Sequence, residues 1–181
     1  MKYTIIILWL LIGASIPLAA QVDVANSEIT FTIPEITQLD IEPDNAPVII
    51  RLQPSNNNPN SLQNLSASDN SKWINYTCAL APQSANRSVY IQINQGSIPI
   101  GMSVTAEASN PVGGAGQLGI AIGSVPLTMS PRRLITDIGG CYTGDGENFG
   151  HNILYTVRLD DVERLGTSSE IMLNVVYTIT E

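Results

Sequence analysis

The feature that most constrains the fold of this chain is a two-residue alternation of apolar and polar side chains that recurs along most of its length. Near the start, Ile29, Phe31 and Ile33 alternate with polar residues. Because successive side chains of a β-strand point to opposite faces, such a run predicts a half-buried strand with one apolar face. Comparable runs include Val48, Ile50 and Leu52; Ile74, Tyr76, Cys78 and Leu80; Val89, Ile91 and Ile93; Met102, Val104, Ala106 and Ala108; Ile120 and Ile122; residues 134–142; Ile153, Tyr155, Val157 and Leu159; and Ile171, Leu173, Val175, Tyr177 and Ile179.

These runs predict an all-β protein. After residue 20, no segment sustains an apolar period of 3.6 residues over three turns, so helix is expected to be scarce. Turn-forming residues separate the runs, and residues 54–60 and the glycine-rich residues 110–119 are predicted loops. Antiparallel strands with one solvated face favour an antiparallel β-sandwich, Ig-like or jelly-roll-like, of about nine strands, and a barrel remains the alternative.

The first twenty residues have the layout of a secretory signal peptide. Lys2 is followed by an apolar run over residues 5–11 and by the small-residue end Leu18-Ala19-Ala20. Residues 1–20 are therefore a predicted signal peptide, and residues 21–181 a predicted single domain that is secreted, periplasmic or at the cell surface. We expect no membrane span in the mature chain, because no later run reaches eighteen apolar residues.

The charge of the chain argues against nucleic acid as a partner. The full sequence holds 8 basic and 16 acidic residues, and removal of the signal peptide takes Lys2 away. The mature chain therefore has a net charge of −9, with Lys72 as its only lysine. Phosphate binding needs a basic patch, so we expect no nucleic acid partner, and we assign the acidity to solubility.

Two cysteines, Cys78 and Cys141, are the only ones in the chain. In an exported protein a disulfide between them would persist, and the chain-entropy model gives such a long loop about 4 kcal/mol of stabilisation. Two reduced, buried thiols are the alternative. A zinc site is not predicted, because His151 is the only histidine and no Cys-x-x-Cys spacing occurs.

No residue pattern predicts an enzyme or a bound cofactor. His151 follows a polar segment and is interpreted as a solvated loop histidine, because no Gly-x-Ser-x-Gly elbow accompanies it. In the same segment Asp145, Glu147 and Asn148 offer oxygen ligands of the kind that calcium prefers. They miss the regular Asp-x-Asp-x-Asp-Gly loop, so an acidic turn between two strands is the plainer interpretation.

Two aromatic side chains are candidates for a binding surface. Trp73 is out of phase with its apolar neighbours Ile74 and Tyr76, so alternation turns it to the other face of its strand, and Tyr90 could project likewise. Exposed aromatic rings can stack on a sugar or a protein partner, although a Trp that covers the edge of the core is common. Three glycosylation sequons begin at Asn64, Asn75 and Asn86.

The two ends of the mature chain resemble exported fimbrial subunits. The alternating segment 28–33 is similar to the N-terminal extension of chaperone–usher pilins and of spore-coat-U-like domains, and residues 173–180 are similar to their final strand. The resemblance implies that Ile29, Phe31 and Ile33 are inserted into a neighbouring subunit as an added strand. The chain departs from the family in two ways: Tyr177 lies four residues from the end, and both cysteines lie in the middle of the chain.

Two functional hypotheses follow. The first is a non-enzymatic structural or adhesive surface protein, a fimbrial-type subunit that assembles with itself or other surface subunits by strand donation. The second is a secreted carbohydrate- or ligand-binding module that uses Trp73 and Tyr90. The fate of residues 21–33 separates them, because a strand exchanged between copies favours assembly and a strand within its own domain favours the binding module.

Overall fold

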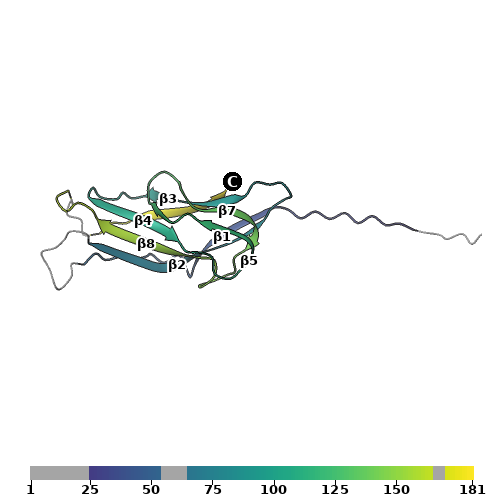
Figure 1. The fold of residues 1–181 in the computed structure, drawn as a ribbon, viewed down its shortest axis with the longest axis horizontal. Coiled ribbons are helices and arrows are strands. Elements are labelled where there is room, and N and C mark those ends of the chain that lie inside the picture. The colour runs from purple at the N-terminus through teal and green to yellow at the C-terminus, as the bar shows by residue number, and fades with distance from the viewer. Residues whose placement is uncertain (1–24, 54–64, 165–169) are drawn as a thin grey trace, which may run out of the picture. The chain divides into compact units, whose positions relative to one another are not determined.

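The computed structural model describes residues 25–53, 65–164 and 170–181, and nine β-strands lie within these ranges (Figure 1). All strand pairings are antiparallel, and no helix occurs in the described ranges. The predicted all-β class and strand number are therefore confirmed. The strands are β1 (Ile36–Glu42), β2 (Ser66–Ala79), β3 (Arg87–Gln95), β4 (Met102–Ala108), β5 (Ala115–Ala121), β6 (Ser124–Pro126), β7 (Arg132–Tyr142), β8 (His151–Leu159) and β9 (Asn174–Thr180).

The chain divides into two units, residues 1–32 and residues 33–181, and all nine strands belong to the second. The predicted signal peptide at residues 1–20 and the predicted loop at residues 54–60 lie outside the described residues. Within the part of the chain that the structure describes, no helix is long and apolar enough to cross a membrane.

The nine strands form one hydrogen-bonded sheet. Seven of them follow the order β6-β4-β8-β2-β7-β3-β9, while β1 pairs with β2 and β5 pairs with β7. Figure 1 shows β2, β8 and β4 running side by side, and β9 closes the other end of the path next to β3. Strands β6, β1, β5 and β9 each have a single partner strand among the described residues, so each is an edge.

The long strand β2 divides this sheet into two groups of strands. Ile74 is paired with Ile41 of β1 and with His151 of β8, whereas Cys78 is paired with Thr37 of β1 and with Cys141 of β7. Strand β1 therefore follows one side of β2, while β8 and then β7 succeed each other along its other side. The group β1-β2-β8-β4-β6 meets the group β5-β7-β3-β9 at this point.

A single apolar cluster joins the two groups of strands. Its fully buried members include Ile74 from β2, Ile91 from β3, Ile138 from β7 and Ile153 from β8. In β2, β3 and β8 the apolar residues have the in-phase spacing that the alternation predicts, so the pattern identifies the buried face of these strands. Strand β7 departs from it, because the adjacent Leu134 and Ile135 are both buried where its register with β3 is irregular.

Three of the predicted elements differ from the observed ones. Residues 110–119 were a predicted loop, yet β5 begins at Ala115. The glycines account for this, because a Cβ on Gly116, whose φ is +88°, would lie 2.2 Å from the Gly140 carbonyl oxygen of β7. Strand β5 can therefore lie against β7 only because Gly116 has no side chain. Ile120 and Ile122 are 61% and 50% exposed, so the prediction that they face the core is wrong.

The two earliest predicted strands do not form. Residues 25–35 have no strand pairing, and Ile29, Phe31 and Ile33 are 84%, 79% and 74% exposed, so the predicted half-buried strand is corrected to an exposed extended segment. Val48, Ile50 and Leu52 are half-buried but belong to no strand. Alternation alone does not create a strand, since a strand also needs a partner with free backbone groups.

Candidate functional site

The exposed N-terminal segment is the most unusual surface of the described chain. Ile29 and Phe31 expose about four fifths of their side chains, and Ile33, the first residue of the second unit, exposes three quarters. Isolated exposed apolar residues are ordinary, but three of them at a two-residue spacing are not. They form one apolar edge of an extended segment, with Glu28, Thr30 and Thr32 between them.

The apolar core is less well covered at β9 than at the neighbouring β3. On β3, Val89, Ile91 and Ile93 are at most 4% exposed. Their register partners on β9, Ile179, Tyr177 and Val175, pack against the same cluster but are only half-buried. Burial therefore falls between one strand and the next, because no further strand pairs with β9 among the described residues.

Strand β9 has none of the features that usually protect a sheet edge. From Asn174 to Thr180 it contains neither proline nor a charged residue. By contrast, β6 is three residues long and ends in Pro126, and β1 carries Asp40 and Glu42. Charges, prolines and shortness deter the addition of another strand, so β9 is a more open edge than β6 or β1. Strand β5 also lacks proline and charge, but its register against β7 shifts between Gly116 and Leu118.

Arg87 connects the start of β1 to the end of β9. Its Nη1 donates to Glu181 Oε1 at 2.6 Å, and its Nη2 donates to Glu35 Oε2 at 3.1 Å. The guanidinium side chain is 14% exposed. Hydrogen bonds from the Ser84 hydroxyl and the Ala81 amide, together with Arg87, lower the pKa of Glu35. Ile33, two residues before Glu35, therefore enters the folded unit close to the C-terminal end of β9.

Two tyrosines connect strands that are not neighbours in the sheet. The hydroxyls of Tyr155 on β8 and Tyr177 on β9 are hydrogen-bonded, although four steps of the strand order separate their strands. Burial raises the pKa of both hydroxyls. The pair satisfies two polar groups beside an apolar core, and it brings a side chain of β8 into contact with one of β9.

Cys78 and Cys141 lie directly opposite each other at the junction of β2 and β7. Both are buried and both thiols are free, so the predicted disulfide is absent from this structure. Burial is the main reason that the pKa of Cys78 is raised and that the pKa of Cys141 rises to about 11. The sequence-based pairing of these two residues nevertheless matches their register.

His151 is fully buried, so its interpretation as a solvated loop histidine is wrong. It is the first residue of β8 and shares the phase of Ile153, a pattern that could have identified it. Its Nδ1 lies 2.7 Å from the Ser109 carbonyl oxygen, and its Nε2 lies 2.7 Å from Tyr76 Oη. The Tyr76 hydroxyl also bonds to the Leu118 carbonyl oxygen.

Acidification is expected to destabilise the fold through His151. Burial lowers its pKa, so the imidazole is neutral in the folded protein at neutral pH. In the unfolded chain the pKa is about 6.5, and below that pH the unfolded state takes up a proton that the folded state excludes. The free energy of unfolding should therefore fall as the pH decreases below about 6.5.

Urea unfolding at pH 7.5 and pH 5.5 tests this expectation, with His151→Gln as the comparison variant. The carboxyls of Glu35 and Asp44 have lowered pKa values, so their contributions are lost only at a more acidic pH. Since His151 is the only histidine, the variant should lose most of the pH dependence in this interval. An equal pH dependence in both proteins would contradict the assignment.

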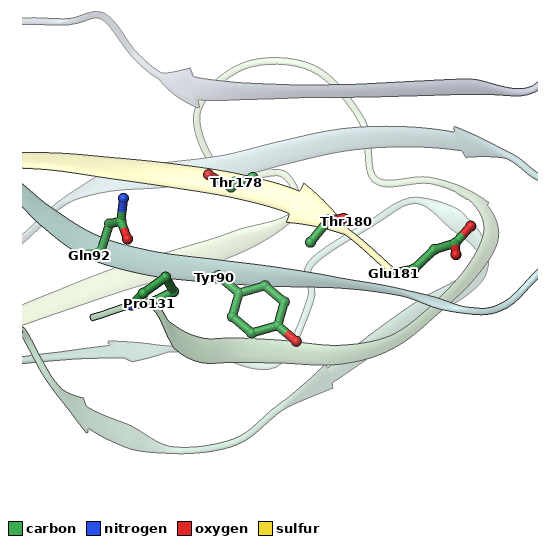
Figure 2. Close-up of a pocket in the computed structure, with 6 residues that line it drawn as sticks. All are labelled: Tyr90, Gln92, Pro131, Thr178, Thr180 and Glu181. Atoms are coloured by element: carbon green, nitrogen blue, oxygen red, sulfur yellow. The ribbon is translucent and has the colours of Figure 1, made fainter. Parts of the chain in front are cut away.

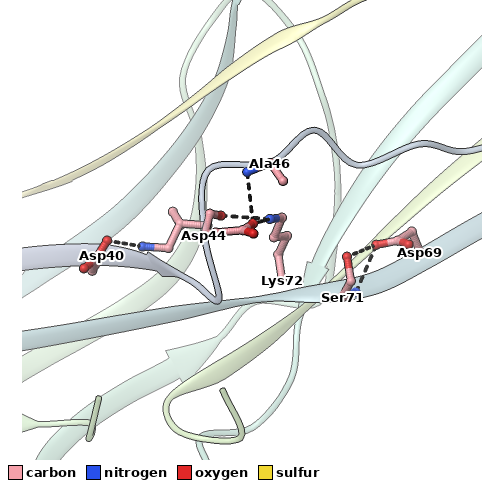
Figure 3. A network of polar contacts seen from close by, with 7 residues as sticks. Asp40, Asp44, Ala46, Asp69, Ser71 and Lys72 are labelled. Atoms are coloured by element: carbon pink, nitrogen blue, oxygen red, sulfur yellow. Dashed lines mark hydrogen bonds and ion pairs between the residues drawn. The ribbon is translucent and has the colours of Figure 1, made fainter. Parts of the chain in front are cut away.

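Lys72 is a buried cation that holds the segment after β1. Its Nζ donates to the backbone oxygen and to the carboxylate of Asp44, each at 2.8 Å (Figure 3). The bond from Lys72 and a second from the Ala46 amide lower the pKa of Asp44. A nearby contact joins Ser71 to Asp69 on β2. Lys72 therefore has a structural role that the composition did not reveal.

Trp73 and Tyr90 do not form one surface. Trp73 is half-buried on β2, where it pairs with Glu42 and Asn152, whereas Tyr90 lies on β3 beyond β7. Tyr90 lines a pocket of about 300 Å³ on the side of β3 and β9 away from the core (Figure 2). The other lining residues, which sequence reasoning missed, are Gln92, Pro131, Thr178, Thr180 and Glu181.

The remaining candidate residues are the possible calcium ligands and the sequon asparagines. Asp145, Glu147 and Asn148 are all exposed, and among the described residues no three His, Cys, Asp or Glu side chains gather where they could hold a metal ion. Of the three sequon asparagines, Asn64 lies outside the described residues and Asn86 is exposed. Asn75 is buried, with its amide donating to the Gly146 carbonyl oxygen, so it is inaccessible in the folded protein.

Comparison with protein-family models, with curated proteins and with solved structures found no match to this chain.

Proposed function

We propose that this chain is a non-enzymatic, exported structural or adhesive surface protein whose copies assemble by strand donation. The donated strand is residues 28–33 of one copy, and the receiving edge is β9 of the next. The observation that carries the proposal is the match between three exposed apolar side chains at a two-residue spacing and three incompletely buried side chains at the same spacing. A strand added beside β9 would place one further apolar side chain next to each of these three side chains. Each would then belong to a row of three side chains that runs from β3 through β9 to the added strand.

Each row has a buried member on β3 and a half-buried member on β9. The rows are Val89 with Ile179, Ile91 with Tyr177, and Ile93 with Val175. Full burial of a large apolar side chain is worth about 1.5–3 kcal/mol, so three such side chains offset a substantial part of the free-energy cost of bringing two copies together. Backbone hydrogen bonds along the open edge of β9 would add to that affinity and would fix the register of the donated strand.

The position of Glu35 supports donation to a second copy over pairing within one chain. Arg87 holds Glu35 beside Glu181, at the C-terminal end of β9. A segment that reaches Ile33 from its own β9 would have to run parallel to that strand. The same segment from a second copy can run antiparallel, as all other pairings in this sheet do.

The proposal includes a two-layer sandwich as the architecture of each subunit. It is supported by the division of the sheet at β2 and by the bond between Tyr155 and Tyr177, because side chains on non-adjacent strands of one flat sheet could not meet. In this arrangement β1-β2-β8-β4-β6 is one layer and β5-β7-β3-β9 is the other. The sandwich is open at β9, where the donated strand completes it.

Size-exclusion chromatography with light scattering tests the proposed function. The mature chain, residues 21–181, should form oligomers, whereas residues 34–181 should give a folded monomer with unchanged β-sheet circular dichroism. A monomeric mature chain, together with a truncated chain that unfolds, would place residues 28–33 in their own subunit and overturn the assembly.

We also propose that Cys78 and Cys141 are joined in the exported protein. The two thiols give up two protons and two electrons to a disulfide of the thiol–disulfide oxidoreductase class, which is reduced to two thiols. Their opposite positions on β2 and β7 require no rearrangement of the strands. Burial disfavours the reactive thiolates, so oxidation should occur before the β2–β7 junction closes.

Protein purified from an oxidising compartment should therefore react with a thiol-alkylating reagent only after it is unfolded and reduced. Reduction should lower the free energy of unfolding by about 4 kcal/mol on the chain-entropy model. The double variant Cys78→Ala, Cys141→Ala should show no effect of the reductant. Alkylation of both cysteines in unfolded, unreduced protein would contradict the bridge.

A further inference from the structure

The pocket on the outer side of β3 and β9 presents one aromatic ring within a set of polar groups. Tyr90 and Gln92 are two residues apart on β3, so both side chains project away from the core, which Ile91 faces. Thr178 lies directly opposite Tyr90 on β9, and Thr180 is two residues further along that strand. Figure 2 shows these side chains with Pro131 and Glu181.

Arg133 holds the Tyr90 ring in place. Its Nε and Nη2 donate to Tyr90 Oη at 3.2 and 2.9 Å, and its guanidinium carbon lies 5.5 Å from the ring centroid. These contacts use the hydroxyl and fix the ring on a central strand of the sheet. A platform whose rotamer is already fixed loses little side-chain entropy when a ligand binds it.

The lining groups suit the alternating apolar and hydroxyl surfaces of a sugar. The guanidinium of Arg133 lies over one face of the ring, so the C–H groups of a pyranose can stack on the other face. Gln92 and the threonine hydroxyls can both donate and accept hydrogen bonds. Glu181 adds a carboxylate acceptor, with its Oε1 oriented by Arg87. A pocket of about 300 Å³ is at the lower end of the range for small-molecule sites and fits one sugar ring.

We propose that this pocket binds a pyranose unit of a neutral glycan. The neutral class follows from the charges around the pocket. Glu181 carries the one charged side chain in the lining, whereas its ion-pair partner Arg87 and the neighbouring Arg133 lie outside the lining. A uronic acid or a phosphorylated sugar would place a second anion near this carboxylate.

This inference goes beyond the proposed assembly and does not depend on it. The pocket lies on the outer side of β3 and β9, whereas the donated strand is added at the free edge of β9. A single subunit therefore carries a complete pocket, and each proposal can fail while the other stands.

Isothermal titration calorimetry of the mature chain with mannohexaose and with maltohexaose tests the site. At least one of them should bind saturably, and Tyr90→Ala should weaken that binding by about tenfold, the effect of removing one well-placed aromatic contact. Gln92→Ala should also weaken it. Tyr142→Ala is the matched control, because Tyr142 is an exposed tyrosine that does not line the pocket.

Three results would overturn the proposal. The first is the absence of binding to either glycan at millimolar concentration. The second is an affinity that Tyr90→Ala leaves unchanged, which would move the site to Trp73 or elsewhere. The third is tighter binding of hexagalacturonate than of the neutral glycans, which would contradict the assigned ligand charge. Circular dichroism of each variant, compared with that of the parent protein, excludes unfolding as the cause of a loss.

Discussion

Replacement of Ile29, Phe31 and Ile33 together by asparagine is expected to convert the assembled protein into monomers. Asparagine keeps the segment soluble and of similar length, but it places a polar amide in each of the three apolar rows. Each lost apolar side chain removes about 1.5–3 kcal/mol of burial, and a total loss above about 4 kcal/mol corresponds to a thousandfold weaker association. Analytical ultracentrifugation over a range of concentrations measures this change.

The matched control changes the residues between the three apolar positions. Glu28→Gln, Thr30→Ser and Thr32→Ser alter the opposite side of the same segment, which the proposed assembly leaves in contact with solvent. The control should therefore assemble as the parent chain does. If both triple variants assembled equally well, the apolar side chains would have no part in association.

The second large effect is a difference between β3 and β9 in how far an alanine substitution lowers the free energy of unfolding. Ile91→Ala on β3 should lower the free energy of unfolding by about 2–5 kcal/mol in the truncated monomer and in the assembled chain, because Ile91 is fully buried in either state. Ile179→Ala on β9 should have a much smaller effect on the monomer, where that side chain is half-buried.

In the assembled chain, Ile179→Ala should instead weaken association, because the donated strand completes the burial of Ile179. Urea denaturation of residues 34–181 measures the effect on the monomer, and sedimentation of residues 21–181 measures the effect on assembly. Equal effects of Ile179→Ala on the two forms would show that nothing further covers β9.

Alternation predicted the faces of the central strands well, because burial on one side of a sheet dictates it. The in-phase apolar residues of β3 and β8 are buried or pack against the core. The same rule failed for Ile120, whose strand β5 presents it to solvent. Periodicity reports that two faces differ, and it does not report which neighbours cover them.

Periodicity also could not predict which strands, distant in the sequence, pair with each other. Residues 28–33 and 48–52 have the alternation of strands but form no backbone hydrogen-bond ladder with a neighbouring strand. In contrast, β1 and the three-residue β6 form because β2 and β4 lie beside them. Register likewise requires the tertiary structure, although the pairing of Cys78 with Cys141 followed from their being the only cysteines.

The candidate site was predicted in part. Ile29, Phe31 and Ile33 were identified from their spacing, and Tyr90 from its phase on β3. Gln92 shares the phase of Tyr90 on β3, but the other pocket residues come from β9, from the residue after it and from the segment before β7. Nothing local in the sequence indicates that these converge on Tyr90. The buried position of His151 could have been deduced, since it is in phase with Ile153.

The central claim is that residues 28–33 of one copy lie against β9 of another. Photo-crosslinking tests it most directly, with benzoylphenylalanine in place of Thr30 and a mixture of ¹⁴N- and ¹⁵N-labelled chains. Mass spectrometry should find crosslinks to residues 174–180 that join a light chain to a heavy chain. Crosslinks confined to single chains, or crosslinks between copies that avoid β9, would contradict the account.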